Sequence, residues 1–283
     1  RPLVHRHIYF AHAFKQQRGW DSLLLRFMRG GGELLDLEYL VDDNGRRLAA
    51  FGYWAGYVGA ALAVLAWSRR KIGAGPALEP LVPWPRQEAL LQDTRELLEH
   101  ARGKLSGPSM IIIGAGGRVG SGAMALASAL HLKTTAWDVA ETAAGGPFPD
   151  ILLHDVLVNC VLADRPMPPF LTPTMLTEHD RQLSIIADVS CDPYGDHNPL
   201  PLYDQCTTLS SPTKVLHGKP KPLDLIAIDH LPALLPREST EDFSHQLLPV
   251  LLQLGNDDTE AWQRARSLFH QKCATIAGSV DNA

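Results

Sequence analysis

The chain has 283 residues, of which 45% are hydrophobic and 20% charged, and its formal net charge is -5. This length exceeds one ordinary domain and predicts a globular protein of two lobes. The absence of a basic block and of an acidic tail argues against a nucleic-acid partner and against a solvating segment.

Residues 1–52 predict the elements of a small lobe. The apolar, aromatic run at 7–14 predicts a strand with His12 on its face, and residues 19–29 predict a helix. In LLDLEYLVDDNGRRLAAFG (34–52), two apolar runs flank DDNG, a pattern typical of a β-hairpin. Taken alone, His12 would more often be a core histidine with satisfied hydrogen bonds than a functional group.

The longest apolar run, LAAFGYWAGYVGAALAVLAW (48–67), is about long enough to span a membrane. Its many glycines and alanines suit close packing against another helix, so we expect a buried connecting helix and no membrane partner. A Pro/Gly linker at 72–85 and an amphipathic helix at 86–103 follow.

The remaining sequence alternates short apolar runs with helical or irregular connections. Such alternation predicts a doubly wound parallel sheet. The expected strands are 109–116, 133–138, 155–162, 183–190, 214–218 and 224–232. The last fifty residues predict helices, which could pack back on the first lobe.

The run MIIIGAGGRVGSGAMALA (110–127) is the strongest local signal, because a strand leads through glycines directly into a helix. Such a loop lets backbone N–H groups and a helix N-terminus approach a pyrophosphate, although the spacing differs from G-x-G-x-x-G. Asp138 ends the next strand, 24 residues after Gly114, where an acidic residue can bind the adenosine ribose and disfavour a 2′-phosphate. NAD is therefore the expected cofactor; the alternative for Asp138 is an exposed cap of the following turn.

Several motifs occur together in one order: FAHAFK, DLEYLVDDNGRRLAAFG, IIIGAGGRVGSGA, WDVAETAAGGPF, DVSCDP and IDHLPALLPRESTEDFSHQLLP. From about residue 3 to 275 the chain resembles the fungal, NAD-dependent, lysine-forming saccharopine dehydrogenases. The resemblance implies an α/β fold of two Rossmann-like lobes, as in alanine dehydrogenases, with the first lobe truncated. Residues 1–52 and 234–283 would form the rest of the substrate lobe, and 53–233 the NAD-binding lobe with its central doubly wound parallel sheet.

The resemblance also implies a reaction, the last step of the α-aminoadipate route to lysine. Saccharopine and NAD would be converted reversibly to L-lysine, 2-oxoglutarate and NADH. The enzyme would act as a monomer, in a cleft between its lobes.

Site residues follow from the same resemblance. His12 matches the catalytic histidine, and imidazole suits the proton transfers of imine hydrolysis near neutral pH. Substrate contacts are implied for Lys15, Gln17, Arg47, Phe51, Ser190, Cys191 and Asp192. Cofactor contacts are expected at Arg46, Gly114, Gly116, Gly117, Arg118, Asp138, Thr142, Leu162, Val189, Ile228, Asp229, His230 and Leu231. Leu162 falls where the family can have tyrosine, and Cys191 is expected to be a bystander rather than a nucleophile.

Three departures from the family pattern affect these expectations. The N-terminal segment is missing, and with it the lysine that acts as general base and an arginine for a substrate carboxylate. Val119 stands where a cysteine could pair with Cys160, and none of the four cysteines forms a CxxC pair, so neither a disulfide nor a metal site is expected. The C-terminus lacks a peroxisomal Ser-Lys-Leu address, which makes the cytoplasm the expected location.

Two other functions stay open at this point. Without its general base the chain could be a catalytically impaired, NAD-binding remnant. It could also be a related amino-acid dehydrogenase that uses ammonia and a smaller substrate such as pyruvate.

Overall fold

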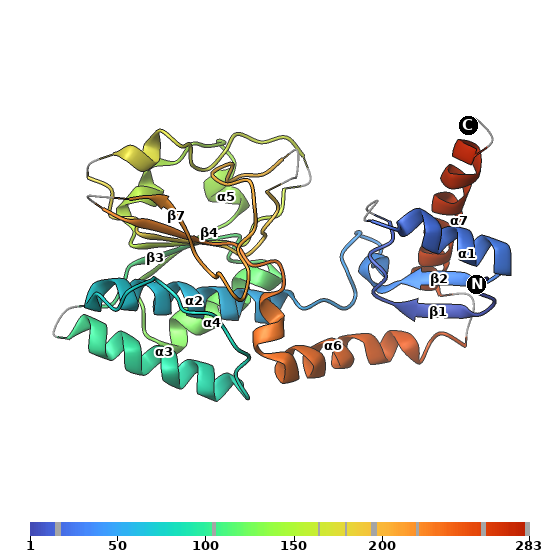
Figure 1. Ribbon diagram of the computed structural model, residues 1–283, viewed down its shortest axis with the longest axis horizontal. Coiled ribbons are helices and arrows are strands. Elements are labelled where there is room, and N and C mark those ends of the chain that lie inside the picture. The colour runs from blue at the N-terminus through green and yellow to red at the C-terminus, as the bar shows by residue number, and fades with distance from the viewer. Residues whose placement is uncertain are drawn as a thin grey trace. The chain divides into compact units, whose positions relative to one another are not determined.

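The computed structural model describes residues 1–14, 18–103, 106–163, 165–178, 180–193, 197–218, 221–255 and 259–280. The chain divides into two compact units, residues 1–50 with 241–283, and residues 51–240 (Figure 1). The divisions predicted from the sequence fall at 52/53 and 233/234. The predicted substrate residues Lys15 and Gln17 lie outside the described residues.

The first unit is built on a short parallel pair of strands. Strand β1 (Arg6–Tyr9) pairs in parallel with β2 (Glu33–Asp36), and helix α1 (Trp20–Gly30) connects them. The 3-10 helix η1 (Leu37–Tyr39) follows β2, and α7 (Glu260–Val280) packs against α1, where the Phe27 and Phe269 rings meet edge to face. This small core places the loop after β1 beside the end of β2.

Two predictions for this unit were wrong. The strand predicted at 7–14 ends at Tyr9, so His12 lies in the loop after β1 and not on a strand face. The loop leaves the strand because Asp36 accepts hydrogen bonds from the backbone N–H groups of Ala11 and Ala13. The hairpin predicted at 34–52 is reduced to one antiparallel bridge, Val41 to Arg47, because β2 pairs with β1 instead.

The second unit begins with the apolar helix α2 (Gly52–Ile72). It is buried on every side from Gly56 to Ser68, as the small residues predicted, and its last turn carries Arg69, Arg70 and Lys71. The Arg70 guanidinium forms two hydrogen bonds of 2.6 and 2.7 Å with the buried Asp224 carboxylate. Among the described helices, none is both long enough and apolar enough to cross a membrane.

A six-stranded sheet forms the centre of this unit, in the order β4-β3-β5-β6-β8-β7. Its strands are β3 (Met110–Ile113), β4 (Thr134–Trp137), β5 (Val156–Asn159), β6 (Ile185–Asp188), β7 (Lys214–His217) and β8 (Leu223–Ile226). All neighbouring strands are parallel except β7, which pairs antiparallel with β8 at the edge of the sheet. The prediction of a fully parallel sheet was therefore wrong for this strand. The chain order reverses between β3 and β5, which makes the carboxyl ends of these two strands the switch point where such sheets bind ligands.

Both faces of the sheet are covered. Helices α2, α3 (Gln87–Arg102) and α4 (Arg118–Ala129) cover one face (Figure 1). The shorter elements η2 (Pro149–Leu153) and η3 (Met175–Thr177) cover the other face, and helix α5 (Val139–Thr142), which buries no residue, follows β4. The buried strand residues alternate between two cores, Ile112 in the first and Ile111 and Ile113 in the second, as the pleat of a two-sided sheet requires.

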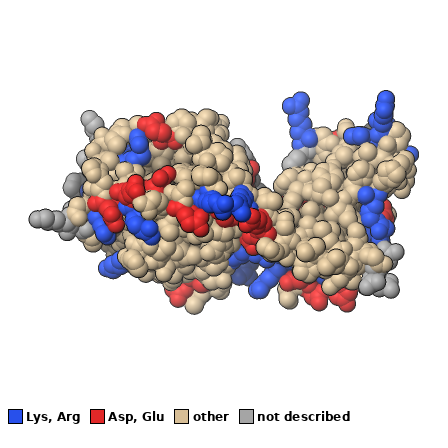
Figure 2. Space-filling view, turned by 90° about the horizontal axis from the view of Figure 1, so that it is seen from below, with Lys and Arg blue, Asp and Glu red and all other residues tan. Residues whose placement is uncertain are grey.

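The remaining elements are η4 (Leu231–Leu234) and α6 (Pro236–Leu251), which starts in the second unit and ends in the first. In the view of Figure 2, acidic and basic side chains are interspersed over the second unit rather than gathered by sign.

Candidate functional site

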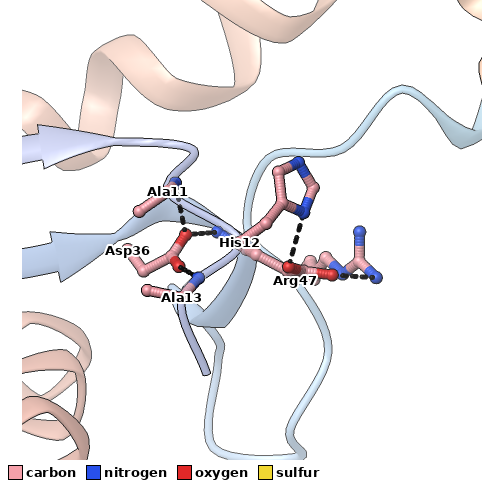
Figure 3. Close-up of polar contacts among 6 residues, drawn as sticks. Ala11, His12, Ala13, Asp36 and Arg47 are labelled. Atoms are coloured by element: carbon pink, nitrogen blue, oxygen red, sulfur yellow. Dashed lines mark hydrogen bonds and ion pairs between the residues drawn. The ribbon is translucent and has the colours of Figure 1, made fainter. Parts of the chain in front are cut away.

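The loop around His12 is held by one carboxylate, that of Asp36 at the end of β2 (Figure 3). Its Oδ1 accepts hydrogen bonds from the N–H groups of Ala11 (3.2 Å) and Glu38 (3.1 Å), and its Oδ2 accepts one from Ala13 (3.2 Å). Between the two alanines, His12 has a φ of 49°, in the left-handed region. The loop therefore turns the imidazole away from β1.

His12, Glu38 and Arg47 form a short polar chain; Figure 3 labels His12 and Arg47, which contact the same Glu38 carboxylate. His12 Nδ1 donates to Glu38 Oε2 at 3.0 Å, and the Arg47 guanidinium lies 3.6 Å from Glu38 Oε1. The Glu38 side chain is 4% exposed, whereas that of His12 is 60% exposed. A buried carboxylate on Nδ1 fixes the ring and leaves Nε2 to exchange protons with a substrate.

Glu38 and Asp36 were not among the site residues predicted from the sequence. Both are acidic residues within the otherwise apolar LLDLEYL, and both are buried. Buried carboxylates need specific partners, so two such residues in a leucine-rich run were a usable signal. The neighbouring Tyr39 has its pKa raised to about 12 by burial and by the charges of Glu38 and Asp36, so its phenol stays protonated at neutral pH.

Arg46 and Phe51 lie at either end of the segment that joins the two units. Arg46 belongs to the first unit, in an exposed turn where its backbone N–H and C=O both bond with Asp42. Phe51 is the first residue of the second unit, and its carbonyl accepts from Ala55 in the first turn of α2. Their predicted roles at the cofactor and the substrate stay predictions.

The glycine loop between β3 and α4 has the geometry of a phosphate-binding turn. Gly114 has a φ of 83°, and its N–H donates to Trp137 O at 2.8 Å. A Cβ on Gly120 would lie 2.0 Å from Gly114 O, which only glycine avoids. Helix α4 starts immediately after Gly117 without a side-chain cap, so its N-terminus is left for an anion.

Asp138 joins this loop to α5. Its Oδ2 accepts from Gly116 N at 2.7 Å, and its Oδ1 accepts from Val139 N at 2.8 Å, within a capping box completed by Glu141. Thr142 Oγ1 donates to the Asp138 carbonyl. Asp138 therefore caps the turn that follows it, which was the alternative to ribose binding. Its carboxylate also lies against the phosphate loop, where it would repel a 2′-phosphate.

A small cavity opens at the carboxyl ends of β5 and β6. The side chains that line it include Asn159, Leu162, Asp188, Ser190, Asp192 and His197. Asp188, 2% exposed, accepts from Asn159 Nδ2 (2.9 Å) and Tyr203 Oη (2.7 Å). Burial raises the pKa of Asp188, and it also raises that of Tyr203 together with the Asp188 charge. This network holds the segment with Ser190 and Asp192 at the switch point.

The cysteines of this unit are free thiols. Cys191 has a φ of 44°, and its Sγ lies 3.0 Å from Cys206 Sγ and 3.1 Å from Ala227 O. Burial and the contact with Cys206 raise the pKa of Cys191, which keeps the thiol protonated and suits a bystander. Across the described residues, the structure shows no cluster of His, Cys, Asp and Glu that could bind a metal.

Several predicted cofactor residues differ in exposure. Ile228 and Leu231 are 1% and 2% exposed, so they offer almost no surface to a cofactor. Val189 lies against Gly59 of α2, while Asp229, His230 and Leu162 are exposed. Their contacts stay predictions.

Relatives among known proteins decide the family. No family model matches the chain. It is 43% identical over 292 residues to saccharopine dehydrogenase (NAD(+), L-lysine-forming) of Candida albicans, covering 97% of this chain and 76% of the relative. The enzymes of the same name are 45% identical in Neurospora crassa (99% and 77% covered) and 46% in Emericella nidulans (97% and 76%). The chain belongs to the saccharopine dehydrogenase family.

The fold comparison agrees with this membership. A solved L-alanine dehydrogenase matches with a TM-score of 0.58 and 15% identity, covering 94% of this chain and 69% of the other. The predicted family and the alanine dehydrogenase-like fold are thus confirmed.

Proposed function

We propose that this member of the saccharopine dehydrogenase family catalyses the NAD-dependent oxidative deamination of saccharopine to L-lysine and 2-oxoglutarate, reversibly. The observation that carries the proposal is the exposed His12 imidazole, fixed through Nδ1 by the buried Glu38, in a chain 43–46% identical to such enzymes. Bound NAD would supply the acceptor for the hydride that leaves the glutamyl α-carbon of the substrate.

The second unit fits this cofactor. Gly120 leaves room for the tight turn, the uncapped N-terminus of α4 suits a pyrophosphate, and Asp138 suits a ribose with free hydroxyls. The first unit supplies proton transfer. The substrate imine must add water and then release the lysine amine, and each step moves a proton that His12 Nε2 could give or take.

Charge complementarity between the carboxylates of saccharopine and Arg47 supports saccharopine as the substrate. Saccharopine carries three carboxylates, and a guanidinium can bind a carboxylate through two hydrogen bonds. Arg47 lies at the edge of the His12–Glu38 pair, where its guanidinium can bind a substrate carboxylate while it stays paired with Glu38. A monomeric state and a cytoplasmic location remain predictions from the family resemblance.

The test is NADH oxidation by the full-length protein with lysine and 2-oxoglutarate, both of which should be required. We expect His12→Gln to lower kcat by about 10²- to 10⁴-fold, the usual contribution of a general acid–base, with little change in the Kd for NADH. His5→Gln, an exposed residue before β1, is the matched control and should retain wild-type activity.

Three results would reject the proposal. An unchanged rate in His12→Gln would remove the proposed role of the imidazole, and activity with ammonia in place of lysine would favour a different amino-acid dehydrogenase. NADH binding without any turnover would indicate the impaired remnant.

A further inference from the structure

Asp36 is a buried carboxylate whose described hydrogen-bond partners are backbone N–H groups. It is 1% exposed and ends strand β2. The three N–H groups that it accepts belong to Ala11, Ala13 and Glu38. Two donors thus flank His12 in the chain, and the third belongs to the residue that bonds His12 Nδ1 (Figure 3).

This arrangement couples both members of the His12–Glu38 pair to one anchor. His12 has a φ of 49°, a left-handed backbone conformation that is uncommon for residues with a Cβ and that contacts around it help to hold. The bonds to Ala11 and Ala13 fix the backbone on both sides of that residue. Because Glu38 N–H shares Oδ1 with Ala11 N–H, a shift of the carboxylate would move the loop and Glu38 together.

We propose that Asp36 is a positioning residue for the acid–base pair: it holds His12 and Glu38 in register, and it acts on the reaction only through them. This inference rests on the proposed function, which gives His12 its role. A direct role for Asp36 does not fit, because both carboxylate oxygens are turned towards backbone donors in a buried position.

Asp36→Asn keeps the size of the side chain but replaces one acceptor oxygen by an NH₂ group, which would face a backbone N–H. We expect kcat to fall by about 10²-fold, since a displacement of about 1 Å in a catalytic group can cost that much. The Kd for NADH should stay at its wild-type value, because the glycine loop belongs to the other unit.

The matched control is Glu33→Gln, the same change of carboxylate to amide on the same strand. Glu33 pairs with Arg6, Arg266 and His270 and with neither His12 nor Glu38 among its described contacts, so kcat should stay at the wild-type value. The pH dependence of kcat/KM adds a readout, because a folding defect lowers the rate without changing the pH at which the profile bends. Partial unfolding would lower kcat/KM at every pH. A displaced His12–Glu38 pair would instead shift, along the pH axis, the limb of the profile that is due to His12, which is identified as the limb that His12→Gln removes.

The double variant separates this inference from the proposed function. If Asp36 acts through His12, then Asp36→Asn in the His12→Gln background should lower kcat by less than about threefold further. Full multiplication of the two losses, or a kcat of Asp36→Asn close to wild type, would overturn the inference. A wild-type rate in His12→Gln alone would overturn the proposed function instead.

The unmodified protein offers a second measurement should the variant fail to fold. The amides of Ala11 and Ala13 lie outside strand β1, yet their bonds to the buried Asp36 should slow hydrogen exchange relative to the turn around Asn44, where N–H groups also bond with an aspartate, Asp42, but lie exposed. Equally fast exchange in the two segments would contradict the anchor.

Discussion

Burying a carboxylate is costly unless donors surround it, and three buried carboxylates of this chain meet that requirement differently. Asp36 binds backbone N–H groups, Glu38 pairs with His12 and Arg47, and Asp188 binds Tyr203 and Asn159. Each of them fixes a loop that carries a candidate site residue. At the scale of single residues, the buried acids explain the site better than the exposed groups that they hold.

The Asp188 network gives a prediction for a neighbouring thiol. Burial, with a smaller contribution from the Asp188 charge, raises the pKa of Cys160 to about 12. Since only the thiolate reacts, a raised pKa leaves a thiolate fraction on the order of 10⁻⁴ at pH 8. Iodoacetamide at pH 8 should therefore leave Cys160 unmodified in the native protein and modify it after denaturation, as read by mass spectrometry. Rapid alkylation of the native protein would contradict the raised pKa of Cys160.

The site was only partly predictable at this scale. The glycine loop and Asp138 could be recognised because close backbone approach and ribose binding each demand particular residue types at a fixed spacing. Asp36 and Glu38 were missed, since their roles depend on a loop 25 residues earlier in the chain. A role for His12 could be predicted only through the family resemblance, because a lone histidine in an apolar run is more often a core residue. The strand predicted around His12 was also wrong.

At the scale of elements, α2 and α4 cross backbone to backbone through two glycines. A Cβ on Gly56 would lie 1.8 Å from Val119 O, and one on Gly122 would lie 1.8 Å from Tyr53 O. These contacts bring the first turn of α4, next to the phosphate loop, against α2. The high glycine and alanine content of residues 48–67 thus reflects this crossing.

Gly56→Ala should destabilise the second unit. Overpacking costs about 1–3 kcal/mol, and a contact with backbone that cannot move aside lies at the upper end. The gain in helix propensity, about 1 kcal/mol, offsets part of it and leaves a net loss of roughly 2 kcal/mol. Urea unfolding measures the change, and the Kd for NADH should rise because the N-terminus of α4 moves.

Gly218→Ala is the matched control, because residue 218 is exposed and a Cβ there meets open space. It should unfold at the wild-type urea concentration. Equal midpoints for the two glycine variants would show that α2 and α4 do not cross as described.

Elements were predictable where their partners are close in sequence or their burial is complete. The central strands read as continuous apolar runs because both faces of the sheet are covered. The hairpin failed because DDNG fixes only a local turn, whereas β2 finds a better partner in β1, across α1. The antiparallel pairing of β7 with β8 was likewise not predictable, because hydrophobic periodicity does not reveal the direction of a strand.

At the scale of the whole molecule, the two units differ in how the chain builds them. The second is one continuous stretch, residues 51–240, with both of its cores and all strands of the six-stranded sheet within it. The first combines residues 1–50 with 241–283, and its cores join Leu24 to Phe269 and Leu35 to Trp262. Folding of the first unit therefore requires both ends of the chain, whereas the second can form from its own segment.

This difference predicts that residues 51–240, expressed alone, fold and bind NADH. The fragment holds the glycine loop, Asp138 and both covered faces of the sheet, and it loses only Arg46 among the predicted cofactor residues. An exposed charge contact contributes about 0–1 kcal/mol, so the Kd for NADH should rise less than about tenfold. Fluorescence titration measures the Kd, and circular dichroism verifies the fold. A fragment with native-like dichroism but no NADH affinity would show that the first unit supplies essential cofactor contacts, and would contradict the assignment of the cofactor to the glycine loop.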